Sequence, residues 1–177
     1  MTTLKSTIKD ICDDLFPNAT FKSFLVNYLI SVRFRVLLNH RIGKFFFNSR
    51  YFLFKQIGVW YKIRLISKRG CDISYNSFIG KNLKMPHPIG IIIGDGVVIN
   101  NNVKIFQQVT FGSHGKKDEK KNYPTIEDNV IIFAGAKIIG NIVVGENAII
   151  GANAVVNIDV PANSIAVGIP CRIIKKL

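Results

Sequence analysis

Residues 126–156, IEDNVIIFAGAKIIGNIVVGENAIIGANAVV, place an apolar residue at every sixth position. An earlier stretch that begins at Ile93 has the same step of six. The apolar positions at this spacing are Ile93, Ile99, Ile105 and Phe111, then Ile126, Ile132, Ile138, Val144, Ile150, Val156 and Ala162. A period of six matches neither the 3.6-residue period of a helix nor the two-residue alternation of a strand. It predicts a solenoid of short strands, in which each side of a coil points one side chain inward.

Small residues, glycine and asparagine mark the corners of this solenoid. The fifth position of each hexad is small or apolar, which fits a narrow interior. Glycine and asparagine recur beside it and supply the backbone conformations of tight turns. An earlier set, Ile73, Ile79 and Met85, keeps the step of six but joins the later register only after two extra residues near Ile91. We interpret these two residues as an irregular corner.

A polar segment separates the two hexad runs. Residues 112–125, GSHGKKDEKKNYPT, are polar and charged, so they cannot face an apolar interior and must loop outwards. We therefore expect a mainly β fold, a parallel β-helix over residues 71–177 with an excursion loop over 112–125.

The first seventy residues predict an N-terminal α-helical region, 1–70. Four apolar residues share one helical face: Leu4, Ile8, Ile11 and Leu15. Thr2 or Thr3 is a suitable cap for this helix, and Pro17 is expected to end it. From residue 21 to 67 apolar and basic residues alternate densely, and we expect Gly43 and Gly58 to divide this stretch into two or three helices.

Composition and charge restrict the function. The chain has 177 residues, 48% of them hydrophobic, and a net charge of +13, and residues 15–71 hold eleven Lys and Arg without any acidic residue. Such a segment suits peripheral contact with an anionic membrane or glycan, or equally an ordinary helical cap with solvated charges. No nucleic-acid-binding motif is present, so we expect no nucleic acid partner. The sequence lacks a signal-peptide pattern and a long apolar run, which favours a cytoplasmic location.

The hexads and their interrupting loop resemble the hexapeptide-repeat acyltransferases. The motifs that carry the likeness are MPHPIG (85–90), VTFG (109–112) and AGAKIIGN (134–141). They are most similar to the serine O-acetyltransferase branch, which includes enzymes of surface-polysaccharide gene clusters. The resemblance implies a left-handed coil, acetyl-CoA as cosubstrate, and a homotrimer, or a hexamer of two trimers, with sites between subunits.

The resemblance places the catalytic chemistry on His87 and Asp72. Acetyl transfer from a thioester to a hydroxyl needs a base for the hydroxyl proton, and histidine is the natural base near neutral pH. His87 matches the catalytic histidine of the family, and Asp72 matches the aspartate that orients it. His114 is a candidate for coenzyme contact or for solvent, and His40 is expected to be structural. Three histidines and three widely spaced cysteines without a CxxC do not form a zinc site, so we expect no metal.

The resemblance also implies the positions that bind the coenzyme. The matching residues are Gly112, Ser113, Ala134 and Ala152, and His114 lies in the segment that lines the coenzyme in the family. Lys116 is a candidate for pairing with a phosphate of the coenzyme. Ala134 and Ala152 are eighteen residues apart, one full coil, so we expect them to stack on one edge. Small side chains there let the pantetheine arm approach the backbone.

The acceptor positions differ from those of serine acetyltransferases. Pro86 replaces an aspartate of that branch, and Asn122 and Tyr123 replace an arginine–histidine pair. A buried zwitterion needs charged partners. The first hypothesis is therefore acetylation of a sugar hydroxyl in a surface polysaccharide or its precursor. The alternatives are serine O-acetylation in cysteine biosynthesis and, less favoured, a non-catalytic trimeric hexapeptide protein.

Overall fold

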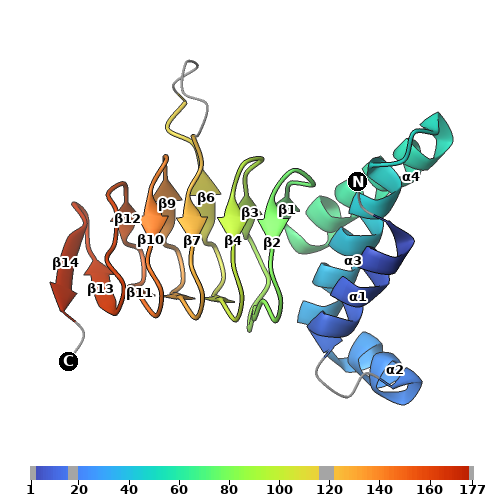
Figure 1. Cartoon of the computed structure of the whole chain (residues 1–177), viewed down its shortest axis with the longest axis horizontal. Coiled ribbons are helices and arrows are strands. Elements are labelled where there is room, and N and C mark those ends of the chain that lie inside the picture. Colours follow the sequence, from blue (N-terminus) through green and yellow to red (C-terminus); the bar gives the residue numbers. More distant parts are fainter. Residues whose placement is uncertain (1–2, 16–19, 116–121, 176–177) are drawn as a thin grey trace.

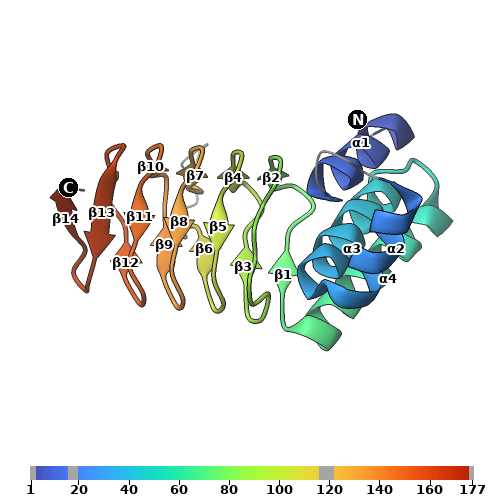
Figure 2. The same cartoon turned by 90° about the horizontal axis from the view of Figure 1, so that it is seen from below.

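The computed structural model of the chain describes residues 3–15, 20–115 and 122–175. Helices gather at one end of a long coil of short strands (Figure 1). The helices are α1 (Leu4–Leu15), α2 (Phe21–Ile30), α3 (Val32–Phe47) and α4 (Phe52–Arg69). Helix α3 contacts the other three helices and lies at the centre of this region (Figure 2). No helix in the described part of the chain is long and apolar enough to span a membrane.

Side-chain caps explain where these helices begin. Thr3 Oγ1 accepts a hydrogen bond from the Ser6 amide, so Thr3 caps α1 as the sequence predicted. Thr20 and Ser23 form a reciprocal capping box at α2, and Ser31 caps α3. Helix α1 ends at Leu15, while the helix terminator expected at Pro17 lies outside the described residues.

The prediction that Gly43 and Gly58 separate helices was wrong. Both glycines lie inside helices, Gly43 in α3 and Gly58 in α4. Their role is close packing: a Cβ on Gly43 would overlap the hydroxyl of Tyr75, and one on Gly58 would lie 2.6 Å from the backbone nitrogen of Phe47. The breaks fall instead at Ser31 and at residues 48–51.

Short parallel strands build the rest of the chain. Their bounds are β1 (Asp72–Ile73), β2 (Phe78–Ile79), β3 (Ile92–Ile93), β4 (Val98–Ile99), β5 (Lys104–Ile105), β6 (Thr110–Gly112), β7 (Thr125–Ile126), β8 (Ile131–Ile132), β9 (Lys137–Ile139), β10 (Val143–Val144), β11 (Ile149–Ile150), β12 (Val155–Val156), β13 (Ser164–Val167) and β14 (Arg172–Lys175). Sheet A has the order β1-β3-β6-β9-β12, sheet B β10-β7-β4-β2, and sheet C β14-β13-β11-β8-β5. This arrangement confirms the predicted parallel β-helix.

The register confirms the step of six and the irregular corner. Ile73 pairs with Ile93, and Ile93 with Phe111, so the two extra residues fall between Met85 and Ile93 where the chain turns from sheet C to sheet A. The expectation that Ala162 continues the inward set was wrong, because this residue is exposed. Val160 takes the inward position instead and pairs with Val144. The corner from Val156 to Val160 is two residues shorter than the six-residue corners before it.

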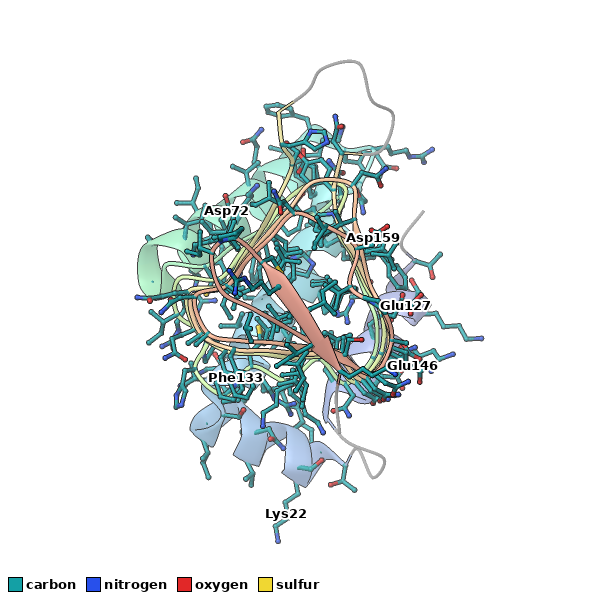
Figure 3. The ribbon with its side chains drawn as sticks, turned by 90° about the vertical axis from the view of Figure 1, so that its left-hand side faces the viewer. Lys22, Asp72, Glu127, Phe133, Glu146 and Asp159 are labelled. Atoms are coloured by element: carbon teal, nitrogen blue, oxygen red, sulfur yellow. The ribbon has the colours of Figure 1, made fainter. Side chains whose placement is uncertain are left out.

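Asparagine adopts the left-handed conformation at the corners between sheets B and C. Five asparagines there have positive φ: Asn82, Asn102, Asn129, Asn147 and Asn163. Figure 3 looks along the coil from its C-terminal end. In this view the chain runs clockwise from Glu127, at the end of β7, to Phe133, just after β8, while it advances toward the viewer. This winding is left-handed, as the resemblance implied.

Both ends of the coil are closed. At the N-terminal end Val36 and Leu37 of α3 and Leu65 of α4 join the apolar core of the coil. Arg41 of α3 donates hydrogen bonds to the carbonyls of Ile79 and Gly80 at 3.0 and 3.1 Å. At the other end β14 pairs with β13 antiparallel. The helical region therefore covers the N-terminal end of the first coil.

Candidate active site

His87 lies on the irregular corner between sheets C and A of the first coil. The corners that follow on this edge, from Ile105 to Phe111, Ile132 to Ile138 and Ile150 to Val156, need six residues, whereas the one from Met85 to Ile93 has eight. The extra length makes this corner bulge, and the side chain of His87 is exposed on it. The bulge gives the imidazole access to solvent and to a substrate.

Neighbouring backbone holds this bulge in place. Pro88 is buried, and its carbonyl accepts a hydrogen bond from the Cys71 thiol at 3.3 Å. The carbonyl of Ile89 accepts a hydrogen bond from the backbone amide of Gln108, in the next coil, at 2.9 Å. Gly90 has φ +66°, a conformation that favours glycine, at the point where the chain turns into β3. The corner is thus fixed from both sides, although its tip is exposed.

Asp72 lies on β1 beside this corner. Its neighbour Ile73 points into the core, so the Asp72 side chain points outward from sheet A (Figure 3). Its Oδ1 lies 3.4 Å from Nζ of Lys62 on α4, and both side chains are partly exposed. Among the described residues no hydrogen bond joins His87 to Asp72. Lys62 is a partner that the sequence analysis missed, because nothing in the hexad pattern indicates which helical residue reaches β1.

His114 lies at the opposite edge of sheet A, where the excursion loop leaves β6. Its ring packs over Gly140 of the next coil: a Cβ on Gly140 would come within 2.9 Å of His114 Cδ2. The carbonyl of Gly112 accepts a hydrogen bond from the Gly140 amide at 2.9 Å, and Ser113 Oγ accepts from the Gly115 amide. The coenzyme-binding candidate Lys116 lies outside the described residues.

Tyr123, on the returning arm of the loop, has a packing role that the sequence analysis did not foresee. Its ring lies across the turn of Gly94 and Gly96, where Cβ atoms would be 2.6 and 2.5 Å from ring carbons. Tyr123 also packs against the apolar core. The glycines at 94 and 96 therefore leave room for this ring at a turn of the chain.

The predicted site residues of a single chain thus fall on two edges. Pro86, His87, Ala134 and Ala152 lie at the corner from sheet C to sheet A. The described residues of the excursion loop, 112–115 and 122–125, lie at the corner from sheet A to sheet B. One face of the coil separates the edges, roughly 15–20 Å for five to six residues at ~3.3 Å each. Within one chain the two groups do not meet.

The first edge carries a ladder of small residues and aromatic rings, of which Phe106 is half-buried and Phe133 exposed. The carbonyl of Ala134 accepts a hydrogen bond from the Asn153 amide at 2.9 Å, which confirms that residues 134 and 152 occupy successive coils. Phe133, which directly precedes Ala134, stacks on Phe106 of the previous coil, with ring centroids 5.1 Å apart. Pro86 holds the corresponding position in the first coil. The sequence does contain a signal for this apolar ladder, because Pro86, Phe106 and Phe133 each directly follow an inward-facing residue.

A hollow of about 440 Å³ opens beside Pro86. Its basic lining residues are Arg33 from α3 and Lys84 and Lys104 from the first two coils. Cations in this position suit an acceptor that carries a carboxylate or another anionic group. The remaining histidine, His40, is buried in α3, where burial and the nearby Arg41 and Lys44 hold its pKa well below the usual value. It is therefore neutral and structural, as expected.

Two family models match the coil. The model described as "Bacterial transferase hexapeptide (six repeats)" matches residues 123–157. The model described as "Hexapeptide repeat of succinyl-transferase" matches residues 73–107. These matches fall on the two hexad runs and leave the helical region and the excursion loop outside them.

Whole-chain similarities extend into the helical region. The chain is 35% identical to a serine acetyltransferase of Buchnera aphidicola over 98% of its own length and 62% of that protein. It superposes on a serine acetyltransferase in complex with CoA with a TM-score of 0.78 at 31% identity, covering 97% of this chain and 71% of the other. For soybean serine acetyltransferase in complex with serine the TM-score is 0.78 at 32% identity, with 96% and 68% covered.

These relatives favour one of the three hypotheses. Eight of its curated relatives are serine acetyltransferases, and the chain spans between 48% and 66% of their length. Acetylation of a polysaccharide, which the acceptor positions placed first, receives no support from them. The serine alternative is favoured instead.

Proposed function

This chain belongs to the hexapeptide-repeat acyltransferase superfamily, among relatives that are serine acetyltransferases, and on that premise we propose that it transfers acetyl from acetyl-CoA to the hydroxyl of serine. The observation that carries this proposal is the similarity to serine acetyltransferases along 98% of the chain. That similarity includes the corner on which His87 is exposed.

In the proposed reaction His87 is the general base. The imidazole takes the proton of the serine hydroxyl as the oxygen attacks the thioester carbon, and it returns a proton to the departing thiolate. The thioester is already activated, so the chain supplies no nucleophile of its own. A solvent-exposed histidine on a backbone fixed by Pro88 and Ile89 is suited to this role, because its tip is accessible while its position is held.

Asp72 is proposed to orient that imidazole. A carboxylate on one ring nitrogen fixes the tautomer and stabilises the imidazolium that forms during the reaction. In this structure the carboxylate lies beside Lys62 instead. The contact with His87 would form in the substrate complex, since catalytic hydrogen bonds are often long before substrate binds.

The coenzyme is proposed to lie along the edge with Ala134 and Ala152. Their small side chains leave the backbone of two coils open to the pantetheine arm, and the stacked rings of Phe106 and Phe133 offer an apolar wall beside it. Gly112, Ser113 and His114 lie on the other edge. A cyclic trimer places different surfaces of neighbouring subunits in contact. A complete site would then combine the first edge of one subunit with the excursion loop of the next.

A sugar hydroxyl is the second candidate acceptor. The observation that favours it is Tyr123, whose ring is committed to packing on Gly94 and Gly96 where the serine branch has a histidine. Pro86 likewise has no charge with which to bind an amine. The basic hollow with Arg33, Lys84 and Lys104 could bind the carboxylate of serine or an anionic sugar, so it does not separate the two candidates.

One experiment tests both acceptors. Thiol release from acetyl-CoA is measured with the purified chain and L-serine, and in parallel with a surface-polysaccharide extract. The expected result is release with serine that falls about 100-fold or more in His87→Ala, the usual range for loss of a general base. The matched control is Asn76→Ala, an exposed corner residue of the same coil. Release with the extract alone would replace serine by a saccharide; release with neither would refute both.

A further inference from the structure

A basic pocket lies within the helical region, away from the coil edges of the proposed acetyl-transfer site. It has a volume of about 250 Å³ between α2, α3 and α4. Four of its lining residues are cationic: Arg35, Arg64, Lys68 and Arg69. Because ligand sites for drug-sized molecules usually measure about 300–1,000 Å³, a space of this size suits a small group.

Among the residues that the structure describes, no carboxylate pairs with the cations of this pocket. The chain has no acidic residue between positions 15 and 71. In the described part of the chain the ion pairs join Arg41, Lys62 and Lys81 to aspartates, and none includes a cation of the pocket. Arg35 Nε is buried and has no hydrogen-bond acceptor, while its Nη1 donates to the carbonyl of Leu29 at 3.3 Å. A buried donor without an acceptor is unusual in folded proteins.

Arg64 is held in a fixed position on the pocket wall. Asn39, which is 7% exposed, accepts a hydrogen bond from Arg64 Nη1 at 3.1 Å. The same amide donates to the carbonyl of Tyr61 at 2.7 Å. The guanidinium also lies over the ring of Trp60, with Cζ 5.6 Å from the centroid. Fixing a charged donor before a ligand arrives lowers the entropic cost of binding that ligand.

Helix geometry explains only part of this cluster. Lys68 and Arg69 lie in the last turn of α4, where cations interact favourably with the helix dipole. Arg35 and Arg64 lie near the beginning of α3 and in the interior of α4, so the dipole gives no reason for them. Their convergence on one pocket requires another explanation.

We propose that this pocket binds a phosphate group, either a phosphomonoester or a diphosphate. Planar guanidinium groups bind phosphate oxygens in pairs, and four cations compensate the charge of such a group. The site is independent of the acetyl-transfer reaction. The phosphate belongs either to a soluble compound or to a lipid head group. The second source fits exposed apolar residues that adjoin lining residues of the pocket, namely Leu29 and Ile30 after Tyr28 on α2 and Trp60 beside Arg64 on α4.

Binding of inorganic pyrophosphate to the full chain, measured by calorimetry at about 0.15 M salt, tests the first source. Binding to phosphatidylcholine vesicles with and without phosphatidic acid tests the second. The double variant Arg35→Gln/Arg64→Gln is expected to weaken binding at least tenfold. The matched control, Arg50→Gln/Lys55→Gln, removes the same charge from exposed positions outside the pocket. It is expected to change affinity less than twofold.

Each outcome decides the proposal. Saturable pyrophosphate binding that is lost in the pocket variant supports a soluble phosphate. Binding only to vesicles with phosphatidic acid, lost in the same variant, supports a lipid head group. If the first variant does not fold, Lys68→Gln/Arg69→Gln on the exposed rim replaces it. No binding to either probe, or equal losses in the pocket and control variants, overturns the proposal.

Discussion

Replacement of Arg41 by methionine tests whether the helical region is fastened to the coil by a buried polar contact. The guanidinium is 7% exposed and donates from Nε to Asp14 at 3.2 Å, and to the carbonyls of Ile79 and Gly80. Asp14 has a side chain that is only 1% exposed. Methionine fills much of the volume but leaves two carbonyls and a buried carboxyl without their donor.

The expected loss follows from these contacts. Breaking a buried ion pair by removing one partner costs about 3–5 kcal/mol, because it leaves an uncompensated charge. Burial already raises the pKa of Asp14, while Arg41 lowers it, so loss of Arg41 lets this carboxyl take up a proton and limits the cost. We therefore expect the free energy of unfolding to fall by about 3 kcal/mol, the lower end of that range.

Urea unfolding at pH 7 and a fixed protein concentration measures this loss. Lys81→Met is the control, because Lys81 is 62% exposed and its pair with Asp13 should contribute less than about 1 kcal/mol. The double variant Asp14→Asn/Arg41→Met should lose less than the sum of the two single losses, by at least about 1 kcal/mol. Strict additivity, or a loss for Arg41→Met no larger than for Lys81→Met, would refute the reasoning.

Three further predictions concern the site, the helical region and the excursion loop. Asp72→Asn should lower turnover about tenfold or more while CoA affinity, measured by calorimetry, stays within twofold; an unchanged rate would exclude Asp72 from orienting His87. Burial makes the pKa of His40 lower in the folded chain than in the unfolded chain, where it is about 6.5. As the pH drops below this value, the unfolded state therefore takes up the proton first. The free energy of unfolding should then decrease by at most ~1.4 kcal/mol per pH unit. Urea midpoints at pH 7.5 and 5.5 measure this loss, and His40→Gln should flatten it; an equal slope in the variant would assign the pH dependence to other groups. Gly96→Ala should destabilise the chain by about 1–3 kcal/mol through its clash with Tyr123, and Tyr123→Ala in the same background should remove most of that effect; thermal unfolding that shows equal losses in both backgrounds would contradict it.

The coil was predictable because its geometry repeats. Each inward residue from Ile93 to Val156 faces the same surroundings, so a period of six in the sequence reports the register directly. Even the bulge that carries His87 was visible as two extra residues. The prediction failed at Ala162, where a corner two residues shorter changed the phase after Val156.

The helical region was less predictable because its packing is irregular. In the sequence Gly43 and Gly58 look like helix ends. Only the positions of Tyr75 and Phe47 reveal that these glycines allow close packing inside helices. The salt bridge from Lys62 to Asp72 joins elements whose relative placement no local pattern encodes. The acceptor positions could not be combined from the sequence alone, because Pro86 and Tyr123 lie on different edges of one chain.

The closed ends of the coil set its length. A stack of parallel strands exposes unpaired amides and carbonyls at each end, and another copy could add there without limit, as in a fibril. Helix α3 blocks one end, and β14, which runs antiparallel and carries Arg172 and Lys175, presents a mismatched, charged strand at the other. These two elements therefore disfavour the end-to-end addition of another copy.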